Sequence, residues 1–257
     1  MQLNKGKILG YLLLTASLAV IIFLSIQMEE EDNSGISSIV LKGNSHLSTE
    51  DYLKYTRLDS KDNFRYLTVN IIKDRFEKHP YIDFASVKRE PNNIIYVNIV
   101  EKKFDAVVTQ WGKSFFITGE YTLIPFYFGT RNVDYPIISG ISRTDTLKPF
   151  FSVRKDLEIK DAFRVMAVAE LIDKNLYSNL SEIICSGERG MQIQFINLDF
   201  PVILGKGEEI KKMVYFGKMW AYFDGKLNND IVEYIDLRYD KHIFLGFNRE
   251  QIEGQSS

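Results

Sequence analysis

The hydrophobic pattern of this 257-residue chain begins with a long uncharged stretch. Residues 8–26 contain no charged side chain, and a helix of that length measures roughly 28 Å, close to the hydrocarbon thickness of a bilayer. Lys5 and Lys7 precede the stretch, whereas residues 29–32 are all acidic. By the positive-inside rule, this pattern predicts a single transmembrane helix, with residues 1–7 in the cytoplasm and the rest of the chain outside.

The alternative interpretation of the stretch is a secretory signal peptide that is removed from the mature protein. The uncharged run is long for the hydrophobic part of a signal peptide, and no small-residue cleavage site follows it. We therefore expect an uncleaved anchor that inserts residues 8–26 into the lipid bilayer. Residues 27–35 are mostly polar and predict a short linker to the exported part.

Residues 36–103 predict a small domain that starts with a strand and two helices. A strand-like run over 36–42 ends at a Gly-Asn turn. The hydroxyl of Ser48 can cap the amide of Asp51, which predicts the start of a first helix. A second helix is expected over 69–78, because its apolar residues recur at helical spacing and His79-Pro80 ends it.

Two β-strands complete this predicted domain. Residues 82–90 and 94–101 are separated by Pro91-Asn92-Asn93, a sequence typical of turns. In the second run, apolar residues alternate with polar ones, as in a strand with one buried face. The expected order of the domain is therefore βααββ.

Residues 104–247 predict a second, larger domain of mixed α/β structure with an antiparallel sheet and two large helices, so the expected fold class is α+β. Residues 104–150 are rich in β-branched and aromatic residues between turns, which favours short antiparallel strands. Residues 248–257 predict a flexible tail. The other expected elements are a helix over 155–177, strands over 191–195 and 199–204, a helix over 208–224 closed by Gly225, and a final β-ribbon over 232–247.

Composition narrows the range of functions. The formal net charge of −2 argues against nucleic acid as a partner, because phosphate binding depends on clustered Lys and Arg. The single cysteine, Cys185, excludes an intrachain disulfide and a Cys-rich zinc site. His46, His79 and His242 are far apart and form no metal-binding motif. Nucleophile and phosphate-loop motifs are also missing, so we expect no cofactor, no metal and no catalytic residue.

Two stretches of this chain resemble a known family. Residues 87–101, VKREPNNIIYVNIVE, resemble the hairpin of the POTRA domain in the bacterial division proteins of the FtsQ/DivIB family, and residues 234–240, YIDLRYD, resemble a signature near the end of that family. The resemblance implies a non-enzymatic divisome scaffold at the septum. It also implies that the C-terminal domain binds an FtsB-like protein paired with an FtsL-like protein, and that the POTRA domain contacts other divisome components.

The sequence departs from the family pattern directly after the hairpin. The family often has Glu-Arg/Lys-x-Pro-x-Ala at this point, whereas residues 101–106 read EKKFDA. This substitution predicts an interdomain connection that is set differently from that of the relatives.

The end of the chain is the predicted partner-binding site. A last strand often lies at a sheet edge, where free backbone groups can pair with a partner strand. Tyr239 and Phe247 are eight residues apart and would share one face of such a strand, and the resemblance matches them to the aromatics that flank the family's partner-binding strand. The alternative is that both are core residues of an ordinary strand. The expected partner-binding residues are Tyr239, Ile243, Phe244, Leu245 and Phe247.

Asp236 and Arg238 are expected to form a structural ion pair, because residues two apart on a strand share a face.

Two other functions remain open at this stage. One is a membrane-anchored envelope enzyme acting on cell-wall polymer, which would need two carboxyl groups roughly 5–10 Å apart in a cleft. The other is a POTRA-type chaperone for exported chains, which would need an open groove beside 94–101. The expected location is the cytoplasmic (inner) membrane at the septum, with the bulk of the chain in the periplasm.

Overall fold

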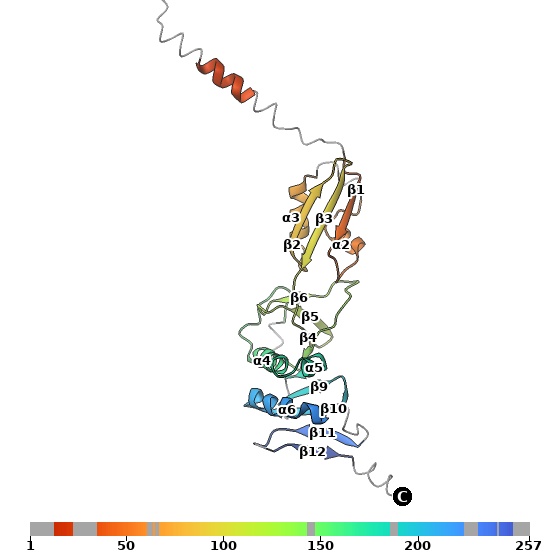
Figure 1. Cartoon of the computed structure of the whole chain (residues 1–257), viewed down its shortest axis with the longest axis vertical. Helices are drawn as coiled ribbons and strands as arrows, with labels where there is room; N and C mark the ends of the chain where they lie inside the picture. The colour runs from red at the N-terminus through yellow and green to blue at the C-terminus, as the bar shows by residue number, and fades with distance from the viewer. Residues whose placement is uncertain are drawn as a thin grey trace, which may run out of the picture.

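The computed structural model describes residues 13–22, 35–60, 64, 67–142, 147–185, 190–223, 231–240 and 242–248. Residues 13–22 form a helix inside the predicted membrane span, and the remainder of that span, the cytoplasmic tail and most of the linker lie outside the described residues. Within the described part of the chain, no helix is both long enough and apolar enough to cross a membrane. From residue 35 onward the molecule is elongated, with two domains stacked along one axis (Figure 1).

The first domain has the predicted βααββ order. Its three strands form a sheet in the order β1-β3-β2, in which β1 runs parallel and β2 antiparallel to β3. Side chains from both helices and from the inner face of the sheet form a single core. The elements are β1 (Ser38–Lys42), α2 (Thr49–Tyr55), α3 (Val69–Glu77), β2 (Ile82–Arg89) and β3 (Ile94–Glu101).

Local sequence explains where these helices begin. The Ser48 hydroxyl accepts a hydrogen bond from the backbone N–H of Asp51 at 3.1 Å, as the capping pattern predicts. Thr68 caps α3 in the same way, accepting from the backbone N–H of Ile71 at 3.3 Å. These caps satisfy amides that have no partner within the helix, so each helix has a defined start.

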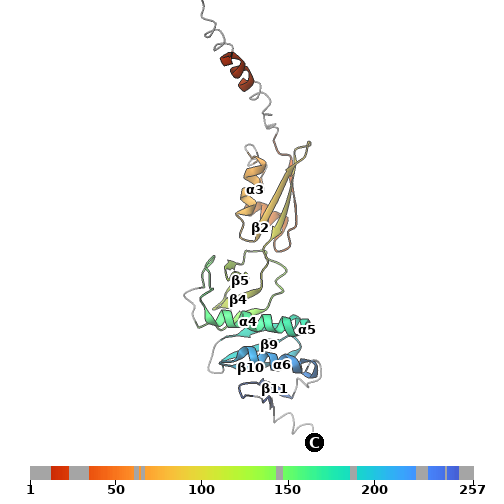
Figure 2. The ribbon, with the colours of Figure 1, turned by 60° about the vertical axis from the view of Figure 1, so that its left-hand side comes forward.

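The second domain contains a nine-stranded sheet with the order β12-β11-β10-β9-β8-β7-β4-β5-β6. Figure 2 shows α4, α5 and α6 in front of its central strands. The elements are β4 (Ala106–Gln110), β5 (Lys113–Ile117), β6 (Leu123–Pro125), β7 (Ile137–Ser139), α4 (Leu157–Ile172), α5 (Lys174–Ser178), β8 (Leu180–Ile184), β9 (Met191–Phe195), β10 (Leu198–Gly205), α6 (Glu209–Phe223), β11 (Val232–Asp236) and β12 (Phe244–Phe247).

The expectation of an antiparallel sheet is wrong for part of this domain. β7 pairs in parallel with both β4 and β8, and β11 pairs in parallel with β10. Parallel neighbours need a crossover connection, and α4 with α5 supplies one between β7 and β8, while α6 supplies another between β10 and β11. The sheet is therefore mixed: helices connect β7 to β8 and β10 to β11, whereas β5 and β6 lie in the connection between β4 and β7.

The single helix expected over 155–177 is also wrong, because it is divided at Asp173. The backbone of Asp173 is extended, with φ −156° and ψ 124°, and its side chain accepts a hydrogen bond from the N–H of Asn175 at 2.7 Å. Asp173 thus ends α4 and caps α5. The expected capping residue of α6, Gly225, lies outside the described residues.

The two domains share an aromatic junction. Phe104, in the connection after β3, stacks on Phe116 with ring centroids 4.2 Å apart and an interplanar angle of 4°. The Tyr81 hydroxyl donates to the carbonyl oxygen of Pro125 at 3.1 Å and accepts from the N–H of Tyr127 at 3.1 Å. Phe104 stands where the family often has proline, so an aromatic stack links the domains at the position where the sequence departs from the pattern.

Candidate functional site

The terminal hairpin of the chain forms one edge of the large sheet. β11 and β12 pair antiparallel, with Ile235 opposite Leu245 and Asp236 opposite Phe244. β12 is the last strand in the sheet order, and in the part of the chain that the structure describes no strand pairs with its outer side. The predicted edge position of the last strand is confirmed among the described strands, and a strand in this position can pair with a partner strand.

Tyr239 does not lie in this strand, which corrects the expected geometry. The backbone N–H of Arg238 donates to the Asp236 carboxylate at 2.9 Å and thereby ends β11, and the N–H of His242 donates to the carbonyl oxygen of Tyr239 at 3.3 Å. The chain leaves the sheet in this turn and returns only at Phe244. Tyr239 and Phe247 therefore do not share a face of one strand.

The five predicted partner-binding residues divide into two groups by exposure. Tyr239 is 57% exposed, and Phe244 and Phe247 are each 49% exposed, so these three aromatics are surface residues. The ring of Tyr239 contacts that of Phe244 edge-on, with centroids 5.1 Å apart. Ile243 and Leu245 are instead partly buried and pack against the core of the domain.

Gly246 and Tyr234 are structural residues of this edge that the sequence analysis missed. The two lie opposite each other across the hairpin, and a Cβ on Gly246 would be 2.3 Å from the Tyr234 ring. The aromatic ring thus occupies the space above the glycine. In a sequence, a glycine that pairs with an aromatic residue on the neighbouring strand indicates this kind of contact.

Asp236 and Arg238 form the expected ion pair. Arg238 Nη2 lies 2.7 Å from Asp236 Oδ2, and Arg238 Nε lies 3.0 Å from Oδ1. Burial by itself would raise the pKa of Asp236, but the hydrogen bonds and charge of Arg238 outweigh it and hold that pKa below its usual value. The stem of Arg238 also covers Gly205, where a Cβ would be 2.6 Å from Arg238 Cγ. The pair fixes the end of β11.

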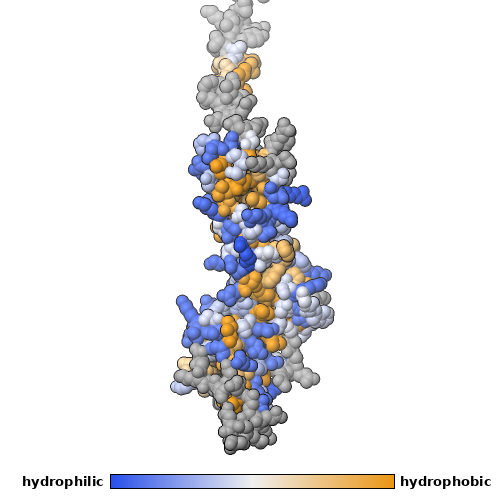
Figure 3. All heavy atoms as spheres, turned by 90° about the vertical axis from the view of Figure 1, so that its right-hand side faces the viewer, coloured by the Kyte–Doolittle hydropathy of each residue, from blue (hydrophilic) through white to orange (hydrophobic). Residues whose placement is uncertain are grey.

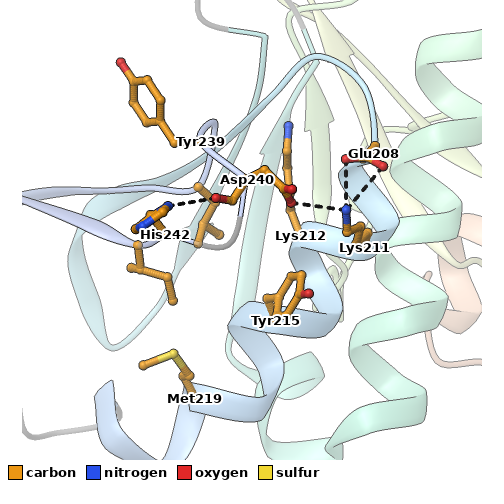
Figure 4. Close-up of a pocket in the computed structure, with 10 residues that line it drawn as sticks. Glu208, Lys211, Lys212, Tyr215, Met219, Tyr239, Asp240 and His242 are labelled. Carbon is orange, nitrogen blue, oxygen red and sulfur yellow. Dashed lines mark hydrogen bonds and ion pairs between the residues drawn. The ribbon is translucent and has the colours of Figure 1, made fainter.

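A pocket of about 250 Å³ lies beside the hairpin, between α6 and the loop that follows β11 (Figure 4). Lys211 Nζ lies 3.3 Å from a Glu208 carboxylate oxygen and 3.2 Å from an Asp240 carboxylate oxygen at its rim. The sequence analysis also missed this pocket, although Tyr215 and Met219 extend the apolar surface of α6 beyond its buried face at helical spacing. The apolar lining residues are Tyr215, Met219, Leu237 and Ile243.

The remaining reactive side chains fit structural roles. Cys185 is buried, and burial raises the pKa of its thiol to about 12, so it is a thiol rather than a nucleophilic thiolate at neutral pH. His79 is buried among aromatic rings, and burial lowers its pKa to about 4. His46 is buried, and its Nδ1 lies 3.2 Å from the Arg131 carbonyl oxygen. Within the described residues, no group of His, Cys, Asp and Glu is placed to hold a metal ion.

Comparison with known proteins identifies the family. Residues 34–102 match the family model of the FtsQ-type POTRA domain, and residues 105–238 match that of the FtsQ/DivIB C-terminal domain. The chain belongs to the FtsQ/DivIB family of cell division proteins. The resemblance inferred from the hairpin and the terminal signature is thereby confirmed.

Named relatives come from distant bacteria. The cell division protein DivIB of Clostridium tetani is 24% identical over 182 residues, which cover 69% of this chain and 66% of that protein. The cell division protein FtsQ of Vibrio cholerae is 24% identical over 226 residues, covering 87% and 79%. FtsQ of Aliivibrio fischeri is 22% identical over 255 residues, covering 97% and 91%. Both domains of this FtsQ/DivIB chain therefore have counterparts in division proteins.

Proposed function

We propose that this FtsQ/DivIB chain is a membrane-anchored, non-enzymatic divisome scaffold that binds an FtsB/FtsL-like complex by strand addition to β12. The observation that carries the proposal is the open outer edge of β12 in the nine-stranded sheet. A partner strand would gain backbone hydrogen bonds along this edge, which set register and supply affinity.

The side chains of the edge support the same role. Natural edge strands are commonly protected by charged residues or proline, whereas β12 reads FLGF and contains neither. Phe244 and Phe247 are half-exposed at this edge, and the Tyr239 ring contacts that of Phe244 from the preceding turn. Aromatic side chains that are rigid and partly exposed are typical anchors of protein interfaces.

The anchor and the location complete the proposal. The uncharged stretch over 8–26 and the charges on both sides of it support a single-pass protein of the cytoplasmic (inner) membrane, with residues 1–7 inside and the bulk of the chain in the periplasm. Family membership supports a position at the division septum. The POTRA domain, close to the anchor, would contact other divisome components.

The carboxylates at the β11–β12 pocket fit a scaffold better than an envelope enzyme. Glu208 and Asp240 both contact Lys211, and their side chains are each 61% exposed. A carboxyl group that acts as a general acid needs a raised pKa, which usually comes from an apolar site rather than from an adjacent ammonium group. This pair is therefore better suited to positioning the loop of residues 237–243.

The test compares capture of the exported part of an FtsB-like partner by full-length chains in detergent. For the double substitution Phe244→Ala and Phe247→Ala, we expect the dissociation constant to rise by about 30-fold or more, as for two interface anchors. The matched control is Phe150→Ala with Phe151→Ala, which removes two exposed aromatics far from β12. Equal capture by all three proteins would contradict strand addition at β12.

A further inference from the structure

The sheet of the POTRA domain has a second face that neither helix covers. The inward residues of β1, β2 and β3 join the core with α2 and α3, so the alternate positions point away from the helices. Strand register places these outward positions in rows, in which Val40 lies beside Tyr96 and Phe84 lies opposite Val100. The uncovered sheet face is formed by Ser38, Val40, Lys42, Phe84, Ser86, Lys88, Ile94, Tyr96, Asn98 and Val100.

This uncovered sheet face is unusually apolar for a solvent-facing surface. Phe84 is 49% exposed and Val100 is 55% exposed, although the two are direct neighbours. In an antiparallel sheet with one solvated side, outward positions are normally polar. Figure 3, which looks toward β1 from the right of Figure 1, shows apolar side chains gathered on this domain with hydrophilic ones around them. Such a patch marks an interaction site.

Lys42 is the charge on the face that favours an acidic partner. Two outward positions are lysines, Lys42 and Lys88, and the exposed Asp83 of β2 lines a pocket together with Val100 at one end of the face. Lys88 pairs with Glu90 at 2.8 Å, whereas no carboxylate of the described residues lies at ion-pair distance from Lys42. A third lysine, Lys73 on α3, holds its ammonium group 5.2 Å from the centre of the Phe84 ring and pairs with Glu77 at 3.7 Å.

The dimensions of the face suit one helix. Three strands about 4.8 Å apart make a surface roughly 14 Å wide, which is roughly 26 Å long over the eight residues of β2 and of β3 and shorter over the five residues of β1. One α-helix of about 17 residues has that length and a diameter of about 10 Å. The strands run along the long axis of the molecule (Figure 1), so a helix packed along them would also be parallel to that axis. If the chain stands on its anchor, such a helix would rise directly from the same membrane.

From this geometry we infer that the uncovered sheet face binds an amphipathic helix with acidic residues on its rim, which continues from the membrane span of another single-pass protein. The apolar stripe of the helix would cover Phe84, Tyr96 and Val100, and a carboxylate on its rim would pair with Lys42. The inference rests on the proposed anchor for the direction of the helix. It does not depend on β12.

The test uses the full chain in its own cells, with a photo-crosslinking amino acid in place of Val100 and, as a control, in place of Glu50 on α2. We expect adducts at position 100 that map to an acidic helical segment directly following a transmembrane span. Adducts with lipid, with a second copy of the chain or with an extended segment would overturn the inference, and so would no adduct at position 100.

A charge reversal tests the chemistry of the same contact. Lys42→Glu should reduce the adduct at position 100 by about fivefold, since it replaces an attraction with a repulsion. Lys54→Glu makes the same charge change on the helical side of the domain and should leave the adduct unchanged. An equal yield from both variants would overturn the acidic partner. Membrane fractionation of the same cells shows separately whether the anchor holds, and capture of the FtsB-like protein reports on β12.

Discussion

Asp236 is the buried charge on which the end of β11 depends. Its residue surface is only 3% exposed, and Arg238 supplies both an ion pair and a backbone hydrogen bond. The partner itself is open to solvent, because the Arg238 side chain is 40% exposed. The pair therefore stabilises less than a fully buried one, but its loss would leave a carboxylate inside the protein.

We expect Arg238→Ala to lower the free energy of unfolding at pH 7, because it leaves the Asp236 carboxylate buried without its ion-pair partner. Because the pKa of Asp236 is lowered in the folded protein, its contribution is complete above the usual pKa of about 4 and is lost as pH falls through the lower folded value. The difference between wild type and Arg238→Ala should therefore shrink as pH falls below 4. Urea unfolding of both proteins at several pH values measures it, and a difference that grows in acid would contradict the pairing.

At the scale of elements, the edge hairpin depends on a glycine. Gly246→Ala should lower the free energy of unfolding by about 1–2 kcal/mol, because the new Cβ would collide with the Tyr234 ring. Tyr234→Ala in the same chain should recover part of that loss. Gly35→Ala is the matched control, since a Cβ there meets nothing within 4 Å. Thermal unfolding of the four proteins measures the effect, and equal melting temperatures for the two glycine variants would refute it.

Elements with local signals were predictable from the sequence. Ser48 at its cap and Pro91-Asn92-Asn93 between β2 and β3 act on their immediate neighbours, so the first domain follows the predicted order. The sequence pattern did not reveal the break at Asp173. A polar residue between the apolar residues of an amphipathic helix is the normal pattern of its exposed face, so Asp173 does not stand out. The parallel pairing of β7 was also hidden, since it depends on strands distant in sequence.

The candidate site shows the same limit. The sequence predicts a last strand at the end of the chain, and such a strand often lies at a sheet edge, as β12 does. Tyr239 leaves the strand because Asp236 and Arg238 form a turn. The sequence did not reveal this turn, since apolar and polar residues continue to alternate through it. The pocket beside α6 depends on the meeting of two distant segments and has no local signal.

At the scale of the whole molecule, the aromatic junction joins two domains into one elongated body. Tyr81 from the first domain bonds to Pro125 in β6 and to Tyr127 just after it, and Asn132 Nδ2 donates to the carbonyl oxygen of Ser45 at 2.9 Å. The core of the first domain also includes Phe116 from the second. This continuity would hold the β12 edge at a fixed distance from the POTRA domain.

Removing the Tyr81 hydroxyl tests the junction. We expect Tyr81→Phe to lower the free energy of unfolding by about 1–2 kcal/mol, because the N–H of Tyr127 and the carbonyl of Pro125 lose a partner. Calorimetry should also show the two domains unfolding less cooperatively. Tyr96→Phe, on the uncovered sheet face, is the control and should change neither quantity. Equal unfolding of both variants would contradict a junction that couples the domains.

The most direct test of strand addition is amide hydrogen exchange at Phe244–Phe247, measured on the full-length chain with and without the exported part of the FtsB-like partner. Pairing with a new strand should slow the outward-facing amides of β12 by at least about tenfold, while the amides of Leu123 and Ile124 in β6, at the opposite edge of the sheet, remain unchanged. Unchanged exchange at β12 in a saturated complex, with protection elsewhere, would contradict the proposed edge and place the partner on another surface.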